Sequence, residues 1–445
     1  MDIPVIPANA SHGDSFLAMK TLCSINYLPN PLLWTYFRMT LSRGHSQRRA
    51  SQSSLEGQRG TLRTSKETLH GNVGIRDRIH HFTWAWFTLT MSTGGIALLL
   101  AKTPHRFKGL TVLGDIVFIL DLVLFICLCA GISARFILFP KTFASSMQHP
   151  TESLFFPTFW ISIVNILSNI QSYGVPRCGD WLVITLRVFF WIYVACTFCV
   201  AVGQYFFLFT GKPLTVQSFT PAWILPVFPV MLTGTLASVI GSSQPSDQAL
   251  PIAMAGVTFQ GLGILISTYM YGIYLGRLMS SGLPRADTRP GMFIAVGPPA
   301  FTGLTFLGIS SNLASIYPAY TTVSGISHPE IIADIFRIVA LCAAVFLWAT
   351  AFWFFSVALV SVVEGALSQG MTFHLVWWAF VFPNVGFTIC TINIGQALES
   401  SGILWLSSVM TVLLVVVWLF VGLAHIRAVW KKQILWPGKD EDHDQ

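Results

Sequence analysis

The stretch VLGDIVFILDLVLFICLCAGISA (112–134) decides the fold class of this chain. It is mostly apolar, and it is long enough to cross the hydrocarbon core of a bilayer, which takes about 20 helical residues. Spanning segments of this length are helices, because hydrocarbon holds no water that could satisfy free backbone groups. The stretch therefore predicts a transmembrane helix rather than part of a soluble core.

Nine further apolar segments have the same character. The composition agrees, since 53% of the residues are hydrophobic and only 10% are charged, against about 25% charged residues in soluble domains. We predict an all-α polytopic membrane protein with ten transmembrane helices paired as five hairpins. The predicted spans are 82–101, 112–134, 154–174, 181–209, 220–241, 248–276, 292–313, 332–361, 374–395 and 402–425.

The polar ends of the chain set the predicted domains. Residues 1–78 are rich in Ser, Arg, Gly and Gln and are predicted to be a disordered cytoplasmic tail. The ten-helix domain covers 79–427, and 428–445 form a cytoplasmic C-terminal tail. Most Lys and Arg residues lie on the side shared by both tails, which predicts cytoplasmic termini. The basic residues form no single folded face, so we expect no nucleic-acid partner.

One loop runs against this charge pattern. The first predicted outside loop carries Lys102, Arg106 and Lys108, although outside loops are normally poor in basic residues.

The odd-numbered spans differ from the even-numbered ones because they carry most of the helix breakers. Proline removes a backbone donor, and irregular backbone at membrane depth is tolerated where it is buried in protein or lines a wet cavity. We therefore predict that the odd spans line a central path and that the even spans surround them. The breakers are Gly94, Gly95, Pro157, Pro226, Pro229, Pro298, Pro299 and Pro383.

The same spans hold most of the polar side chains predicted to lie inside the membrane. Hydroxyls and amides can donate hydrogen bonds to an anion, and half-helix N-termini at proline breaks suit carboxylates. The alternative is hydrogen bonding between neighbouring helices. The predicted substrate pathway comprises Thr90, Ser92, Thr93, Asn165, Asn169, Thr233, Thr235, Gly297, Pro298, Pro299, Thr302, Asn384, Thr388 and Thr391.

Charged residues inside the spans are few, and Asp121 and Arg187 are the candidates for proton or substrate handling. Structural pairing or snorkelling to the interface is the alternative for each. The sequence carries no phosphate-binding loop and no paired metal-ligand motif. We therefore expect no cofactor, no metal and no enzymatic activity. A membrane-bound enzyme or sensor is the alternative from another class, but it lacks a motif to support it.

Several long motifs, in order along the chain, closely resemble the tellurite-resistance/dicarboxylate transporter family of the slow anion channel superfamily, above all its fungal malic acid permeases. The resemblance covers about residues 78 to 442 and includes FQGLG (259–263) and WPGKDED (436–442). The long N-terminal tail matches no part of this pattern. The main motifs are HFTWAWFTLTMSTGG (81–95), TPAWILPVFP (220–229), RPGMFIAVGPPAFTGL (289–304) and WWAFVFPNVGFTICTINIG (377–395).

The resemblance implies a quasi-fivefold ring of hairpins around a central pore, often assembled as a homotrimer. It also implies transport of C4-dicarboxylates such as malate and succinate, often with protons, and we expect a plasma-membrane location. A sulfite or other small-anion exporter or channel of the same fold is the alternative. In these relatives an aromatic side chain on the ninth helix blocks the pore. The matching residue is Phe382, with Phe380 as its neighbour; a core or lipid-facing aromatic is the other interpretation.

Overall fold

The computed structural model describes residues 74–211, 215–324, 329–368 and 370–436, with the side chains of these ranges apart from 314–330 and 332. Ten helices in these ranges are long and apolar enough to cross a membrane, as predicted. The described ranges contain no strand. Most of the predicted tails lies outside the described residues, apart from the short helix α3 (Ile75–His80) and the end of the last span. The domain boundaries stay predictions.

The spans alternate along the chain between two sets. The inner spans contain α4 (Phe87–Lys102), α7 (Glu152–Asn169), α10 (Phe228–Ile240), α12 (Gly297–Ser324) and α14 (Phe382–Ala397). The outer spans are α5 (Leu110–Leu138), α9 (Asp180–Thr210), α11 (Ser246–Ser281), α13 (Pro329–Ser368) and α15 (Ser401–Trp430). Two short helices, α6 (Lys141–Gln148) and α8 (Val175–Cys178), lie between spans.

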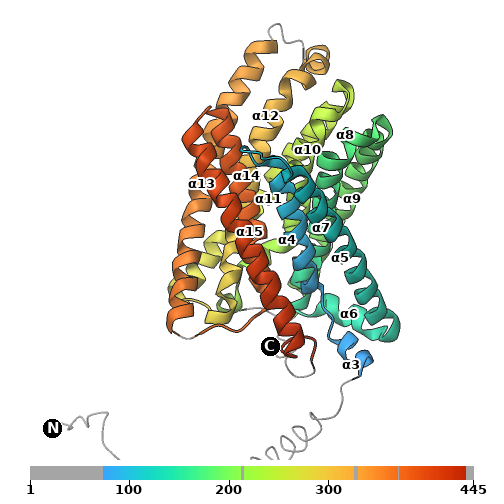
Figure 1. The fold of residues 1–445 in the computed structure, drawn as a ribbon, viewed down its shortest axis with the longest axis vertical. Coiled ribbons are helices and arrows are strands. Elements are labelled where there is room, and N and C mark those ends of the chain that lie inside the picture. The colour runs from blue at the N-terminus through green and yellow to red at the C-terminus, as the bar shows by residue number, and fades with distance from the viewer. Residues whose placement is uncertain (1–73, 212–214, 325–328, 369, 437–445) are drawn as a thin grey trace, which may run out of the picture. The chain divides into compact units, whose positions relative to one another are not determined.

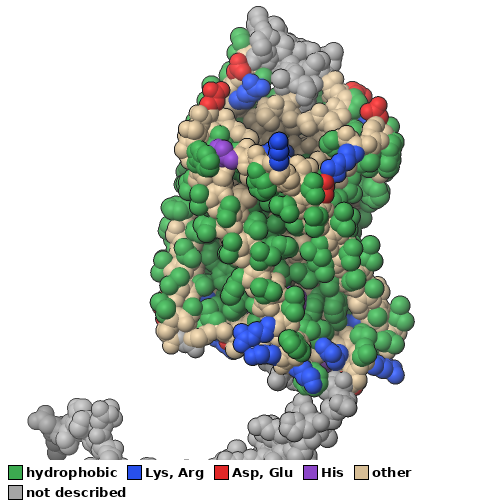
Figure 2. Space-filling view, in the orientation of Figure 1, with side chains coloured by type: hydrophobic (Ala, Val, Ile, Leu, Met, Phe, Trp, Pro, Cys, Tyr) green, Lys and Arg blue, Asp and Glu red, His purple; other side chains and the backbone are tan. Residues whose placement is uncertain are grey.

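Burial separates these two sets. Between 61% and 94% of the apolar window of each inner span is buried, against 17% to 33% for each outer span. Hydrophobic side chains cover the middle of the face shown in Figure 2, and charged side chains gather at its two ends. The odd-numbered spans are therefore the buried ones, and the even-numbered spans present their apolar side chains outward.

The inner helices contact one another in a closed order, α4 to α7 to α10 to α12 to α14 and back to α4. Each inner helix also contacts the outer span that follows it in the chain. In Figure 1, α3 and the last turns of α15 lie at one end of the bundle, which we call the tail end; the opposite end is the far end. The structure gives this order of contacts only. The quasi-fivefold ring around a central pore remains a prediction.

Four inner spans change their helix type partway across. They begin at the tail end as 3₁₀ helices, η2 (Trp84–Trp86), η5 (Pro221–Val227), η7 (Ala286–Val296) and η8 (Leu375–Phe380), and then become α4, α10, α12 and α14. The prolines Pro229, Pro298 and Pro383 lie in the first turns of the α-helices, where a missing N–H is tolerated. In the remaining inner span, a π-helical turn, η3 (Ile170–Gly174), follows α7. The proline breaks thus place three α-helix N-termini inside the bundle.

Candidate functional site

A wide vestibule opens at the far end of the inner helices. Its volume is about 850 Å³, and α4, α10, α12, α13 and α14 all contribute to its wall. Much of this wall consists of hydroxyl and amide side chains, which can donate hydrogen bonds to an anion. These are Thr103, Thr235, Ser238, Ser242, Ser310, Ser311, Asn312, Asn393 and Gln396.

Three cationic side chains line the same vestibule, namely Lys102, Arg106 and Arg337, and no Asp or Glu is among the described residues that line it. Arg106 donates hydrogen bonds to two backbone carbonyls at the end of α4. The distances are 3.2 Å to the carbonyl of Leu100 and 2.8 Å to that of Ala101. Lys102 has no hydrogen bond or ion pair with any residue that the structure describes. A cavity lined by one sign of charge concentrates counter-ions. The basic first loop, which runs against the charge pattern of the sequence, therefore helps to build an anion-attracting vestibule.

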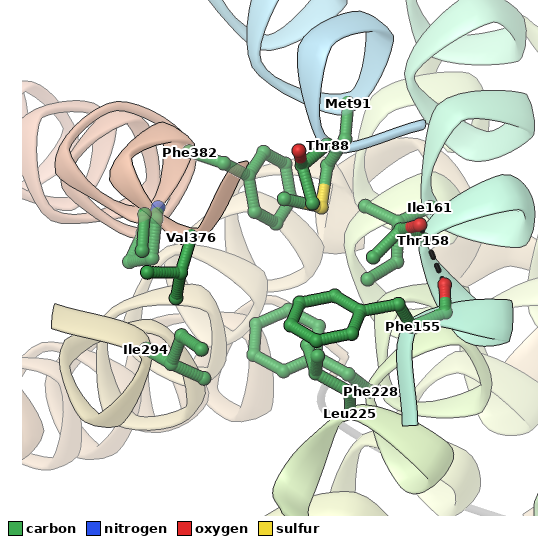
Figure 3. A pocket seen from close by; sticks show the side chains of 12 residues that line it. Thr88, Met91, Phe155, Thr158, Ile161, Leu225, Phe228, Ile294, Val376 and Phe382 are labelled. Carbon is green, nitrogen blue, oxygen red and sulfur yellow. Dashed lines mark hydrogen bonds between the residues drawn. The ribbon is translucent and has the colours of Figure 1, made fainter. Parts of the chain in front are cut away.

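A second, much smaller cavity lies nearer the tail end, and all five inner spans contribute to it. Its volume is about 20 Å³, which is room for about one water molecule. Figure 3 shows side chains from separate helices pointing toward one another around it. Only Thr88 and Thr158 bring hydroxyls to a wall that is otherwise apolar. The lining residues are Thr88, Met91, Phe155, Thr158, Ile161, Leu225, Phe228, Ile294, Val376, Ala379, Phe382 and Pro383.

Three phenylalanines separate the two cavities, and we call them the aromatic partition: Phe228, Phe301 and Phe382. Phe301 lines the vestibule, whereas Phe228 and Phe382 line the small cavity. The rings of Phe301 and Phe382 are stacked with centroids 5.0 Å apart, and Phe228 lies 5.7 Å from the first and 6.0 Å from the second. All three side chains are buried. The three rings therefore lie in contact with one another between the residues that line the two cavities.

Each ring of the partition rests on a glycine of another inner helix. A Cβ atom at Gly297 would lie 2.7 Å from Phe228, one at Gly386 would lie 2.6 Å from Phe301, and one at Gly95 would lie 3.3 Å from Phe382. Glycine permits this close approach because it has no side chain. The partition is therefore assembled from helix pairs α10 with α12, α12 with α14, and α14 with α4.

Comparison with known proteins agrees with this architecture. The sequence profile of the voltage-dependent anion channel family matches residues 81–426. The chain belongs to this family. Two Schizosaccharomyces pombe relatives are 36% and 37% identical to it over 83% of this chain and 84% to 85% of their own lengths, and the first is named malic acid transport protein. A protein of Arthroderma benhamiae named sulfite efflux pump is 26% identical over 77% of this chain and 89% of its own length.

These names describe transporters, which agrees with the prediction that the chain is an integral membrane transporter rather than an enzyme. The resemblance read from the motifs is likewise confirmed by the family match.

The two predicted gate residues lie in different surroundings. Phe382, in the first turn of α14, belongs to the aromatic partition. Phe380 instead contacts Phe293 and Trp377, with ring centroids 5.4 Å and 6.0 Å apart, and it lines neither cavity. The gating roles of both residues remain predictions. Of the two, Phe382 is the one that lies between the cavities, so that a movement of its ring could join them.

Many of the predicted pathway residues are hydrogen-bonded between helices. Asn165 and Asn169 of α7 donate to the carbonyls of Met91 and Gly94 of α4, at 2.7 Å and 2.8 Å. Thr90 bonds Ser162, Ser92 donates to the carbonyl of Trp378, Thr93 accepts from Trp418, and Thr391 accepts from Trp348. These contacts are the hydrogen bonds between neighbouring helices that the sequence analysis gave as the alternative to a pathway role. A pathway role for these residues stays a prediction.

A second group of predicted residues connects the vestibule to the break in α12. Thr235, which lines the vestibule, contacts the hydroxyl of Thr305 at 3.2 Å, and Thr305 donates to the fully buried Gln260. Gln260 donates to Thr302, which in turn donates to the carbonyl of Pro298 at 2.7 Å. Pro299 follows in the same first turn, and Gly297 lies under the ring of Phe228. These hydrogen bonds among side chains of α10, α11 and α12 thus hold the start of α12 in place.

The remaining predicted polar residues lie on α10 and α14. Thr388 donates to the carbonyl of Asn384, and the Asn384 amide donates to the carbonyl of Phe380 at 2.9 Å. The Thr233 hydroxyl and the Asn384 Oδ1 atom are buried and have no hydrogen-bond partner in the part of the chain that the structure describes. These two atoms remain available inside the bundle.

The two charged candidates both lie on outer spans. Asp121 of α5 is completely buried, its carboxyl group has no side-chain hydrogen-bond partner or ion pair among the described residues, and the polar group that adjoins it is the backbone of Gly94. Its Oδ2 atom would lie 2.7 Å from a Cβ placed on Gly94, so the carboxyl group rests against α4. Arg187 of α9 is half-buried and has no hydrogen bond or ion pair with the described residues. Neither residue lines a cavity.

Sequence reasoning did not single out Phe228, Phe301, Gln260 or Arg337 as vestibule or partition residues. A signal for two of them is present, because Phe228 directly precedes Pro229 and Phe301 follows Pro299 by two positions, as Phe382 precedes Pro383. A phenylalanine within two positions of a proline therefore recurs on three successive inner spans. Gln260 lies in the FQGLG motif (259–263), which marks the family but not this contact, and no local pattern places Arg337 at the vestibule.

Proposed function

We propose that this chain transports C4-dicarboxylates such as malate and succinate across a membrane. The observation that carries the proposal is the hydroxyl-rich vestibule, which holds three cationic side chains and ends at the aromatic partition. Cations at two separate parts of the wall, Lys102 and Arg106 at the end of α4 and in the loop after it, and Arg337 of α13, which also pairs with Asp334 at 3.7 Å, suit a solute with two separated negative charges. The 36% identical malic acid transport protein supports the same substrate class.

We further propose that a movement of Phe382 opens the pathway. Beyond the partition, α10 and α14 begin at residues that line the small cavity, Phe228 and Phe382, and helix N-termini favour negative charge. A carboxylate that enters there would meet partial positive charge in place of water. We place both tails in the cytoplasm and the vestibule outside, in a plasma-membrane protein assembled as a homotrimer; the basic tail-side loops support this orientation.

Transport assays on the purified full-length protein in liposomes test this function. Labelled malate and succinate should accumulate well above protein-free liposomes, whereas citrate and sulfite should move more slowly. Faster movement of sulfite than of malate would instead favour the anion-exporter alternative, which the sulfite efflux relatives support. Absence of malate flux under every condition would contradict the proposal.

Lys102→Gln gives a sharper form of the same test. The change should raise the half-saturating malate concentration about fivefold, because one exposed charge contributes roughly 1 kcal/mol. The effect should shrink at high ionic strength, since salt screens exposed charges. Lys108→Gln is the matched control, because Lys108 lies in the same loop but does not line the vestibule.

We also propose that transport is coupled to protons and that Asp121 carries the proton. The groups that adjoin it at Gly94 are neutral, namely the side chains of Asn165 and Asn169. The ion pair between Asp115 of α5 and Arg177 of α8 is exposed. An unpaired charged carboxylate at this depth is costly, so the surroundings favour the neutral, protonated group.

The glycine pair of α4 links this carboxyl group to the partition. Gly94 faces Asp121, and Gly95, the next residue, faces the ring of Phe382. A shift of α4 that follows loss of the proton would therefore reach Phe382 without any intervening side chain.

Asp121→Asn should flatten the pH response of malate uptake. We expect uptake by the wild-type chain to rise as external pH falls between about pH 7 and about pH 4, because Asp121 must bind the proton that is carried with the substrate and protons are more available at low pH. The asparagine keeps the shape but binds no proton, so its uptake should change little over this range. Asp115→Asn should keep the wild-type slope. If Asp121→Asn also keeps it, the proton travels on the acid itself and Asp121 has no coupling role.

A further inference from the structure

A deep apolar groove runs along the outside of the bundle, between the outer spans α5 and α15. Its volume is about 780 Å³. Figure 1 shows α4 beside α15, and α4 contacts both outer spans, so this inner helix forms the floor. The wall residues Leu120, Leu419, Leu423 and Ile426 are each more than 40% exposed, so the groove opens toward lipid. Further apolar side chains line the groove, namely Trp86, Leu89, Leu124, Trp378, Trp418, Val429 and Trp430.

The tail end of this groove is polar and cationic. Arg78 and Lys432 line it there, together with His425. The Nε atom of Arg78 and the Nε2 atom of His425 are buried and have no hydrogen-bond partner among the described residues. The indole N–H of Trp378 donates to Nδ1 of His425 at 3.1 Å. Nδ1 is therefore an acceptor, and in a neutral imidazole Nε2 carries the proton and is a donor. Two unsatisfied donors thus converge on one end of an apolar groove.

We propose that this groove binds an anionic glycerophospholipid from the leaflet next to the tails of the chain. The lipid phosphate would lie against Arg78 and Lys432, an ester carbonyl would accept from Nε2 of His425, and an acyl chain would follow the apolar walls. His425 lies in the last two turns of α15, and Lys432 follows the end of that helix by two residues, so one lipid can contact the cationic end and the apolar part together.

The chemistry of the groove favours this occupant over a second copy of the chain. Buried donors without partners are unfavourable, and both would be satisfied by phosphate and ester oxygens. Basic residues near a membrane surface attract anionic lipids. A protein surface laid across the groove would leave the slot between α5 and α15 unfilled and both donors unsatisfied. The inference goes beyond the proposed transport function, and its test measures lipid rather than flux.

Native mass spectrometry of the full-length protein tests the proposal. The protein is exchanged into mixed vesicles of phosphatidylserine and phosphatidylcholine and then released in detergent. The wild-type chain should retain phosphatidylserine in preference to phosphatidylcholine. Arg78→Gln should lower this retention about tenfold, in line with the loss of a charge-assisted contact. Arg78→Lys should restore much of it.

Arg76→Gln is the matched control. Arg76 lies two residues away in the same helix, α3, but it stacks over the ring of Phe139 and does not line the groove. It should retain lipid as the wild-type chain does. If Arg76→Gln and Arg78→Gln lose equal amounts of phosphatidylserine, the lipid is held by general surface charge and the proposal is wrong. Equal retention of phosphatidylserine and phosphatidylcholine by the wild-type chain would also overturn it.

Leu423→Trp tests the apolar part of the site independently. The added bulk at this exposed wall position should fill the groove and reduce retained lipid of either kind. Each variant is compared with the wild-type chain by thermal melting, so that a folding defect is recognised. If Leu423→Trp dissociates an oligomer and leaves lipid retention unchanged, a second copy occupies the groove and the proposal is wrong.

Discussion

Phe382→Ala should open the pathway and raise malate flux through the reconstituted protein at least about tenfold. The Phe382 ring is stacked on Phe301, and it separates a vestibule of about 850 Å³ from a cavity of about 20 Å³. Removing the ring joins the two cavities. Lowering the barrier by only about 1.4 kcal/mol would give a tenfold faster rate. Initial rates of labelled malate uptake into liposomes measure the effect.

Two further variants make this prediction discriminating. Phe301→Ala removes the other half of the stack and should raise flux in the same direction. Phe380→Ala is the control, because that ring packs on Phe293 and lines neither cavity. A large aromatic-to-alanine change in a core costs about 3–5 kcal/mol, so each variant is first shown to be folded by its melting curve. A folded Phe382→Ala protein with wild-type flux would remove Phe382 as the gate.

Glu152→Gln should destabilise the protein by about 3–5 kcal/mol, because it leaves a buried guanidinium without its counter-charge. Glu152 begins α7, and it forms an ion pair with Arg135 of α5; both side chains are at most 3% exposed. The Arg135 group also donates to the carbonyl of Phe82 at 2.8 Å, and Ser146 of α6 donates to Glu152. The pair therefore joins three helices at the tail end. Thermal and denaturant unfolding in detergent measure the loss.

An exposed ion pair provides the comparison. Asp115→Asn breaks the pair with Arg177, whose side chain is 57% exposed, and it should cost about 1 kcal/mol or less. Combining Glu152→Gln with Arg135→Gln should recover part of the lost stability, since no unpaired charge then remains buried. If Glu152→Gln and Asp115→Asn cost the same, the buried pair does not hold the tail end together.

The membrane spans were predictable because their signal is local. Each of the ten predicted segments overlaps one observed span, and most observed spans extend a few residues further, as α11 does from 246 to 281 against a predicted 248–276. Hydrocarbon favours an uninterrupted apolar helix whatever its neighbours are. Proline positions were equally informative, since Pro298 and Pro383 lie where the 3₁₀ helices give way to α12 and α14.

The candidate site was predictable only in part. Phe382 was named through family resemblance, and Thr235 through its polarity on an inner span. The stacking partner Phe301 and the cation Arg337 were not, because a ring partner or a vestibule wall depends on which helices meet. Asn165 and Asn169 have the same polar character as vestibule residues, yet their amides bond the backbone of α4.

The sequence by itself determined the number of spans and the alternation between proline-broken inner spans and strongly apolar outer spans, because these follow from composition and spacing along each segment; the family followed from the resemblance of its motifs. Only the tertiary structure decided which side chains meet: that three phenylalanines contact one another between two cavities, each resting on a glycine of another helix, and that Lys102, Arg106 and Arg337 share one vestibule. The physical reason is that helix packing sets the rotation and depth of every span, and it brings together residues more than two hundred positions apart.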